Sequence, residues 1–127
     1  MNPVVHFEMP AEDRKRMADF YARTFGWKMQ MFGEEMGNYV LVSTTDTDES
    51  GNATTPGAIN GGFFIKTSDN TAPSVVISVD DINAHVKKVT DAGGKVLGEP
   101  AEIPGIGWYA SFIDPEGNRV SMLQGTG

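Results

Sequence analysis

A strand, a helix and a glycine recur in this chain at an offset of 68 residues, and this repeat constrains the fold more than any other feature. The first copy runs from the strand around His6 to Gly26, and the second runs from the strand around Ser74 to Gly94. Self-similarity at a fixed period is typical of folds built from duplicated units. The sequence therefore predicts two pseudo-symmetric halves.

Apolar periodicity predicts the order β-α-β-β-β in each half. The expected strands cover about 4–9, 27–32, 38–43, 58–66, 74–79, 95–99, 108–113 and 118–124, and the expected helices cover about 12–25 and the stretch between Asp81 and Gly93. The polar stretch 44–57 has no such periodicity and is too long for a tight hairpin turn. We expect it to form either a solvated hairpin extension or a lid.

Composition excludes several classes of function. The chain has 127 residues, no cysteine and a net charge of −7, from 10 basic and 17 acidic residues. Such a surface repels phosphate backbones and anionic lipids, so neither nucleic acid nor a membrane is an expected partner. The missing cysteines remove disulfides and thiolate chemistry. No signal peptide is apparent at the start of the chain, and the expected location is the cytoplasm.

The first strand carries two side chains with useful chemistry on one face. Residues alternate between the two faces of a strand, so His6 and Glu8 point the same way, opposite Phe7 and Met9. A neutral imidazole is a natural proton acceptor near pH 7, and a neighbouring carboxylate can raise its pKa. His6 is thus open to three interpretations: a hydrogen-bonding group in a pocket, a general base assisted by Glu8, or a metal ligand. His85, the other histidine, is expected to pack on its helix.

Several short motifs resemble those of the vicinal oxygen chelate superfamily, which includes glyoxalase I, bleomycin-resistance proteins and extradiol dioxygenases. They are His6 with Phe20-Tyr21, Phe25-Gly26-Trp27, Val79-Asp80-Asp81, Ala92-Gly93-Gly94, and the run from Phe112 through Asp114-Pro115-Glu116-Gly117 to Asn118. The resemblance implies an α+β fold in which two βαβββ modules, about 4–66 and 74–124 of one glyoxalase-like domain 1–127, form a curved mixed sheet that encloses a cleft. It also implies a homodimer.

Metal-dependent members of this superfamily hold a divalent ion on four side chains, two from each module. By resemblance these positions here are His6, Ser74, Ser121 and a residue within 58–63, where Asn60 is the only side chain with an oxygen. Serine hydroxyls are poor ligands for zinc, nickel or iron. We therefore expect no metal cofactor.

Three functions are consistent with these features. The first is a metal-free protein that binds a small organic molecule, as bleomycin-resistance relatives do. The second is a metal-independent isomerase or lyase in which His6 and Glu8 move a proton, and the third is a metal-dependent glyoxalase or dioxygenase. For the first two, the expected ligand-binding residues are Ser74, Trp108, Arg119 and Ser121.

Overall fold

The computed structural model describes residues 1–125, which fall into two compact units. One unit is His6–Pro73, and the other joins Met1–Val5 to the chain from Ser74 onward. The units correspond to the two predicted modules, except that residues 1–5 group with the second module, where Ser78 N donates to Pro3 O at 2.9 Å. The last two residues of the expected domain 1–127 lie outside the described residues.

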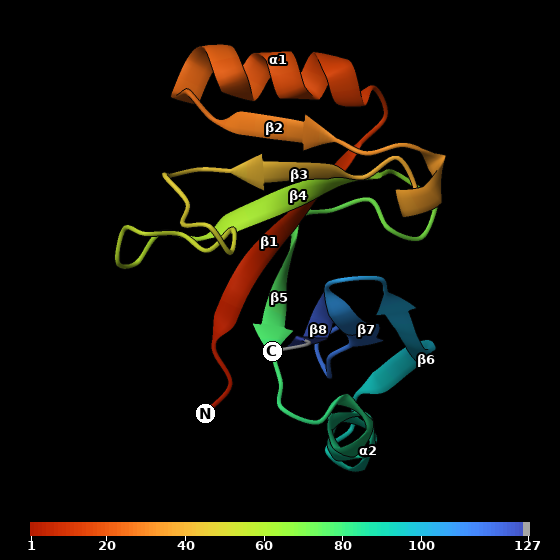
Figure 1. The fold of residues 1–127 in the computed structure, drawn as a ribbon. Helices are drawn as coiled ribbons and strands as arrows, with labels where there is room; N and C mark the ends of the chain where they lie inside the picture. Colours follow the sequence, from red (N-terminus) through yellow and green to blue (C-terminus); the bar gives the residue numbers. More distant parts are fainter. Residues whose placement is uncertain (126–127) are drawn as a thin grey trace. The chain divides into compact units, whose positions relative to one another are not determined.

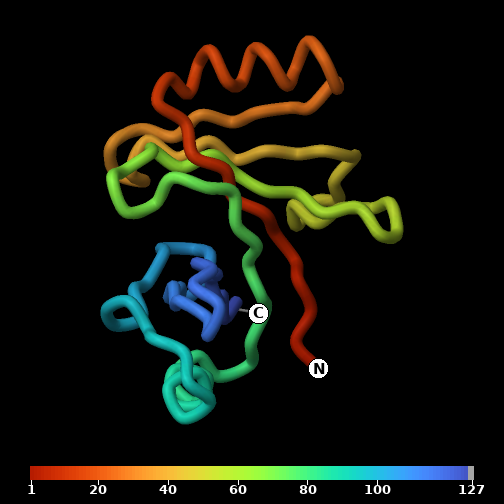
Figure 2. Tube along the Cα trace, turned by 180° about the vertical axis from the view of Figure 1, so that it is seen from behind, coloured from red at the N-terminus to blue at the C-terminus, as the bar shows by residue number. Residues whose placement is uncertain are grey.

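Each module has the predicted order β-α-β-β-β (Figures 1 and 2). The first contains β1 (Val4–Ala11), α1 (Arg14–Phe25), β2 (Lys28–Met31), a short 3-10 helix η1 (Glu34–Met36), β3 (Val40–Ser43) and β4 (Asn60–Ile65). The second contains β5 (Ser74–Ser78), α2 (Ile82–Asp91), β6 (Lys95–Ile103), β7 (Gly107–Ile113) and β8 (Arg119–Gly125). The strand orders are β2-β3-β4-β1 and β5-β8-β7-β6. In both, the first and last strands of the module pair in parallel and the other pairs are antiparallel.

The helices begin and end where their sequences provide caps. The side chain of Asp13 accepts from Arg16 N at 3.0 Å, and that of Asp81 accepts from Ala84 N at 3.1 Å. Each bond satisfies one of the backbone donors that a helix leaves open in its first turn. Gly26 ends α1 with a φ of 75°, a left-handed conformation that glycine adopts without steric cost. No helix within residues 1–125 is long and apolar enough to cross a membrane.

In each module the helix packs against one face of the module's strands. In the first module Met17 and Tyr21 of α1 pack against a core of Val40, Val42 and Phe63. The second module has a matching core, made of Val79, Ile82, Ala110 and Met122. Because side chains alternate along a strand, the neighbours of these core residues point to the opposite face. In the first module that opposite face carries His6 and Glu8, and in the second it carries Ser111 and Ser121.

The stretch 44–57 forms a hairpin extension that is held by its own hydrogen bonds. Thr47 and Ala53 form an antiparallel bridge, and the carboxylate of Asp48 accepts from the backbone of Ser50 and of Asn52, both at 2.9 Å. The interpretation as a hairpin extension is confirmed.

Candidate functional site

His6 and Glu8 are joined by a tyrosine that lies about thirty residues further along the chain. The hydroxyl of Tyr39, just before β3, lies 2.9 Å from His6 Nε2 and donates to Glu8 Oε2 at 2.9 Å. All three residues belong to the first module. The two side chains that strand alternation placed on one face of β1 thus contact a single phenol.

Gly62 provides the space in which this phenol lies. Glu8, Gly62 and Leu41 are direct partners across β1, β4 and β3. A Cβ added at Gly62 would overlap the hydroxyl and the ring of Tyr39. The backbone of Gly62 has no left-handed φ, so close approach of the ring, and not conformation, requires glycine there.

The hydrogen bonds determine which atoms of this group carry a proton. An ionised carboxylate only accepts, so Tyr39 gives its single hydroxyl proton to Glu8. The Tyr39 oxygen can then only accept from His6, which places the ring proton on Nε2 and a lone pair on Nδ1. Nδ1 has no hydrogen-bond partner among residues 1–125, yet these residues contain no buried unsatisfied side-chain nitrogen or oxygen. Solvent therefore reaches Nδ1.

Burial sets the charge of the imidazole. Loss of solvent around the ring lowers the pKa of His6 from its ordinary value of 6.5, and the negative charge of Glu8 opposes this shift only in part. Glu8 raises the pKa of His6, as expected from the sequence, but the lowering of this pKa by burial is larger. His6 is consequently neutral at pH 7, beside a Glu8 side chain that is only 7% exposed.

The second module holds a different polar group, made of hydroxyls. Ser121 in β8 lies 2.7 Å from the hydroxyl of Tyr109 and 2.9 Å from that of Ser111, measured between oxygens. Ser121 is 2% exposed and is the direct partner of Val76 in β5 and of Ser111 in β7.

Strand register shows which positions of the two modules are equivalent. Gly62 pairs with Glu8 and Leu41, as Ser121 pairs with Val76 and Ser111. Ser121 is therefore equivalent to Gly62.

The remaining ligand position, expected within 58–63, thus falls on Gly62 and not on Asn60, whose side chain is the one with an oxygen in that range. Asn60 lies two residues earlier, opposite His6, where its Oδ1 accepts from Thr44 N at 2.9 Å. A range in the sequence does not specify strand register, so the sequence left the residue within this range open.

The residues at the four superfamily ligand positions do not fit a transition metal. They are His6, Gly62, Ser74 and Ser121: one imidazole, two hydroxyls and no side chain at the fourth. Zinc, nickel and iron sites in proteins use imidazole, carboxylate or thiolate. Within residues 1–125, no three histidine or acidic side chains gather at a point where they could hold an ion.

The remaining predicted residues divide between the two faces of the second module. Arg119 shares a face of β8 with Ser121, and Ser74 shares a face of β5 with Val76, the partner of Ser121. Trp108 lies on the other face with Ala110, and 41% of it is exposed. The aromatic residue near the hydroxyls is Tyr109 instead.

His85 lies on α2, with Nδ1 3.2 Å from the carbonyl oxygen of Asp81.

Sequence reasoning missed Tyr39, although this residue alternates with the core residues Val40 and Val42 and so had to point away from α1.

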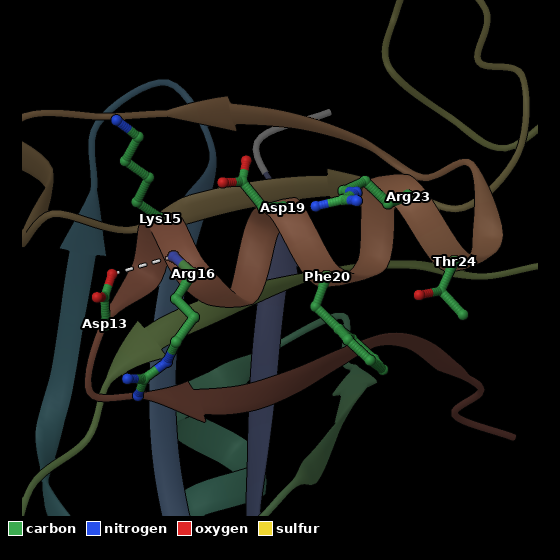
Figure 3. Close-up of a pocket in the computed structure, with 7 residues that line it drawn as sticks. All are labelled: Asp13, Lys15, Arg16, Asp19, Phe20, Arg23 and Thr24. Carbon is green, nitrogen blue, oxygen red and sulfur yellow. Dashed lines mark hydrogen bonds between the residues drawn. The ribbon is translucent and has the colours of Figure 1, made fainter.

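An open hollow lies on the exposed side of α1 (Figure 3). It is lined by Asp13, Lys15, Arg16, Asp19, Phe20, Arg23 and Thr24. All of these belong to α1 or to its N-cap, and none is a predicted site residue.

Comparison with known proteins agrees with this architecture. The model of the Glyoxalase/Bleomycin resistance protein/Dioxygenase superfamily matches residues 4–122, and the chain belongs to this superfamily. It is 33% identical over 116 residues to a glyoxylase-like domain-containing protein of Didymella fabae, covering 87% of this chain and 84% of that protein. It is 27% identical over 123 residues to the probable lactoylglutathione lyase of Vibrio cholerae, covering 95% and 89% of the two chains.

Among solved structures, the chain is similar to Streptomyces coelicolor methylmalonyl-CoA epimerase in complex with 2-nitronate-propionyl-CoA. The TM-score is 0.70 at 17% identity, covering 98% of this chain and 97% of that one. At this identity the similarity shows the fold alone, which is the predicted α+β fold of two βαβββ modules.

Proposed function

We propose that this protein binds a small organic molecule on the polar face that carries His6, without a catalytic metal. The observation that carries the proposal is the bridge of Tyr39 between His6 and Glu8, 2.9 Å from each. It leaves Nδ1 of a neutral imidazole open to solvent, next to a buried carboxylate. Small-molecule sites in proteins typically place a few fixed polar groups among apolar side chains.

The second module carries hydroxyls and a guanidinium on one face of its strands. Ser74, Arg119 and Ser121 lie on that face and remain our proposed ligand-binding residues of that module. Trp108 does not remain among them, because it lies on the opposite face of β7.

A thermal-shift screen of small carbonyl and carboxylic compounds on the EDTA-treated protein tests the proposal. Compounds that raise Tm in the wild type should lose this effect in His6→Ala and keep it in the matched control His85→Ala. A ligand that stabilises both variants equally would place the binding site elsewhere.

Metal analysis gives a second test, in which one nickel, zinc, iron or manganese ion per chain would contradict the metal-free site.

A metal-independent isomerase or lyase is our second candidate. It is favoured by the lone pair on Nδ1, because the charge of the imidazolium formed on proton uptake would be stabilised by Glu8 through Tyr39. In such a reaction Nδ1 takes a proton from a carbon next to a carbonyl and returns it to the same or a neighbouring atom.

Proton transfer is tested by deuterium incorporation into a bound carbonyl compound in D₂O, followed by NMR. The rate should fall about 10²- to 10⁴-fold in His6→Ala. If the wild type binds the compound but shows no deuterium exchange, the binding function stands and the enzymatic function is rejected.

The homodimer and the cytoplasmic location stay predictions, and light scattering tests the dimer.

A further inference from the structure

We infer that Tyr39 is a positioning residue for His6: its hydroxyl holds the imidazole in the tautomer protonated on Nε2, which presents Nδ1 to the ligand as an acceptor. This inference rests on the proposed function, since it assigns the ligand class for the same site. The ligand must offer Nδ1 a hydrogen-bond donor or an acidic C–H group.

The direction of the hydrogen bonds supports this assignment. The bonds run from His6 Nε2 to the Tyr39 oxygen and from the Tyr39 hydroxyl to Glu8 Oε2. Reversing the first bond would require Tyr39 to give its one proton to His6, which would leave a buried carboxylate facing the lone pairs of a phenol. The buried charge of Glu8 therefore sets the direction of both bonds.

The fold holds the phenol in place from two sides. Gly62 leaves the space that the ring and hydroxyl occupy. The guanidinium of Arg14 donates to the carbonyl oxygens of Phe32 at 2.6 Å and of Asn38 at 3.1 Å. Phe32 N in turn donates to Tyr39 O at 2.9 Å, so both ends of the turn before β3 are fixed. Tyr39 consequently approaches His6 from a constrained backbone.

NMR of the histidine side chains tests the inference without any ligand. Ring N–H protons exchange rapidly with water unless a hydrogen bond protects them. We expect a protected proton on Nε2 of His6 in the wild type, with the two histidines assigned by means of His85→Gln. The signal should be lost in Tyr39→Phe, which keeps the ring and removes the hydroxyl.

Gly62→Ala provides a second route to the same result, because the added methyl group displaces the phenol without removing its hydroxyl. Gly125→Ala, in β8, is the matched control, because an added Cβ there has no neighbour within 4 Å. The control should keep the protected Nε2 proton.

Three outcomes would overturn the inference: a wild-type ring proton on Nδ1, no protected ring proton in the wild type, or an Nε2 signal that persists in both Tyr39→Phe and Gly62→Ala. Failure to find a ligand would affect the proposed function and leave this result intact. The converse result is a ligand that binds to the wild type through His6 although the protected Nε2 proton is absent. That result would reject the role of Tyr39 and leave the proposed binding function intact.

Discussion

Tyr39 and Tyr109 occupy equivalent positions in the two modules, each two residues before the strand residue that pairs with Gly62 or with Ser121. Tyr39 lies over Gly62 and reaches His6 and Glu8, whereas Tyr109 bonds to the hydroxyl of Ser121 at 2.7 Å. In both modules a phenol thus lies beside the last-strand position that holds a ligand in metal-dependent relatives. The two copies differ in what the phenol contacts.

Replacement of Gly62 by alanine should destabilise the protein. The added methyl group overlaps the phenol, and overpacking of this kind costs about 1–3 kcal/mol of unfolding free energy. Urea denaturation measures the loss, and Gly125→Ala should stay within about 0.5 kcal/mol of wild type. If the phenol is the cause, the double variant with Tyr39→Ala will lose less than the sum of the single losses. Additive losses would reject the overlap as the cause.

His6 should make stability depend on pH in a window below 6.5. Burial lowers the pKa of His6 in the folded state, with Glu8 opposing, so below the ordinary value of 6.5 the unfolded chain binds more protons than the folded one. The unfolding free energy contributed by His6 is therefore lost as pH falls from 6.5 through the folded-state pKa. Urea denaturation at several pH values should show this dependence in wild type and its absence in His6→Gln. Identical pH profiles would contradict it.

Glu8→Gln should lower the pKa of His6 further. The carboxylate is the group that raises this pKa against the effect of burial, so removing its charge leaves burial unopposed. An NMR titration of the His6 ring measures the shift, with Glu12→Gln as an exposed control. A higher pKa in Glu8→Gln would show that the carboxylate does not act on the ring as a charge.

Loss of the Arg14 guanidinium should destabilise the first module. Its two hydrogen bonds hold the carbonyls of Phe32 and Asn38, and hydrogen bonds from a charged group contribute about 1.5–3 kcal/mol. Arg14→Met keeps the aliphatic stem and should lower the unfolding free energy by roughly this amount. Arg16→Met, on the exposed side of α1, is the matched control and should have little effect. Equal losses of unfolding free energy in the two variants would show that the hydrogen bonds to the turn are not the cause.

Ser121→Ala should destabilise the second module through the partners it leaves behind. Tyr109 and Ser111 would each lose a hydrogen bond to a buried oxygen, at a cost of about 1–3 kcal/mol. Thermal and urea denaturation against the exposed control Ser68→Ala measure the difference. A wild-type stability for Ser121→Ala would show that these hydroxyls find other partners.

Much of the fold could be predicted because its signals are local. The repeated order of strands and helices and the alternation in β1 depend on residue patterns within single elements, and the structure confirms them. The shared face of His6 and Glu8 follows from the same alternation.

The composition of the candidate site was only partly predictable. The offset between modules is 68 residues for His6 and Ser74 but 59 for Gly62 and Ser121, because the connections between strands differ in length. A constant offset therefore aligns the first strands of the two modules but not the last ones, and within the expected range 58–63 only strand register places the position at Gly62.

The sequence alone determined the two βαβββ modules, the superfamily and the lack of most metal-ligand side chains, since each depends on residue identity and local periodicity. Only the tertiary structure decided what His6 contacts. Strand pairing brings Tyr39 over Gly62, burial makes the imidazole neutral, and the charge of Glu8 directs the ring proton toward Tyr39. These are long-range effects of register and solvent exclusion, which no local pattern encodes.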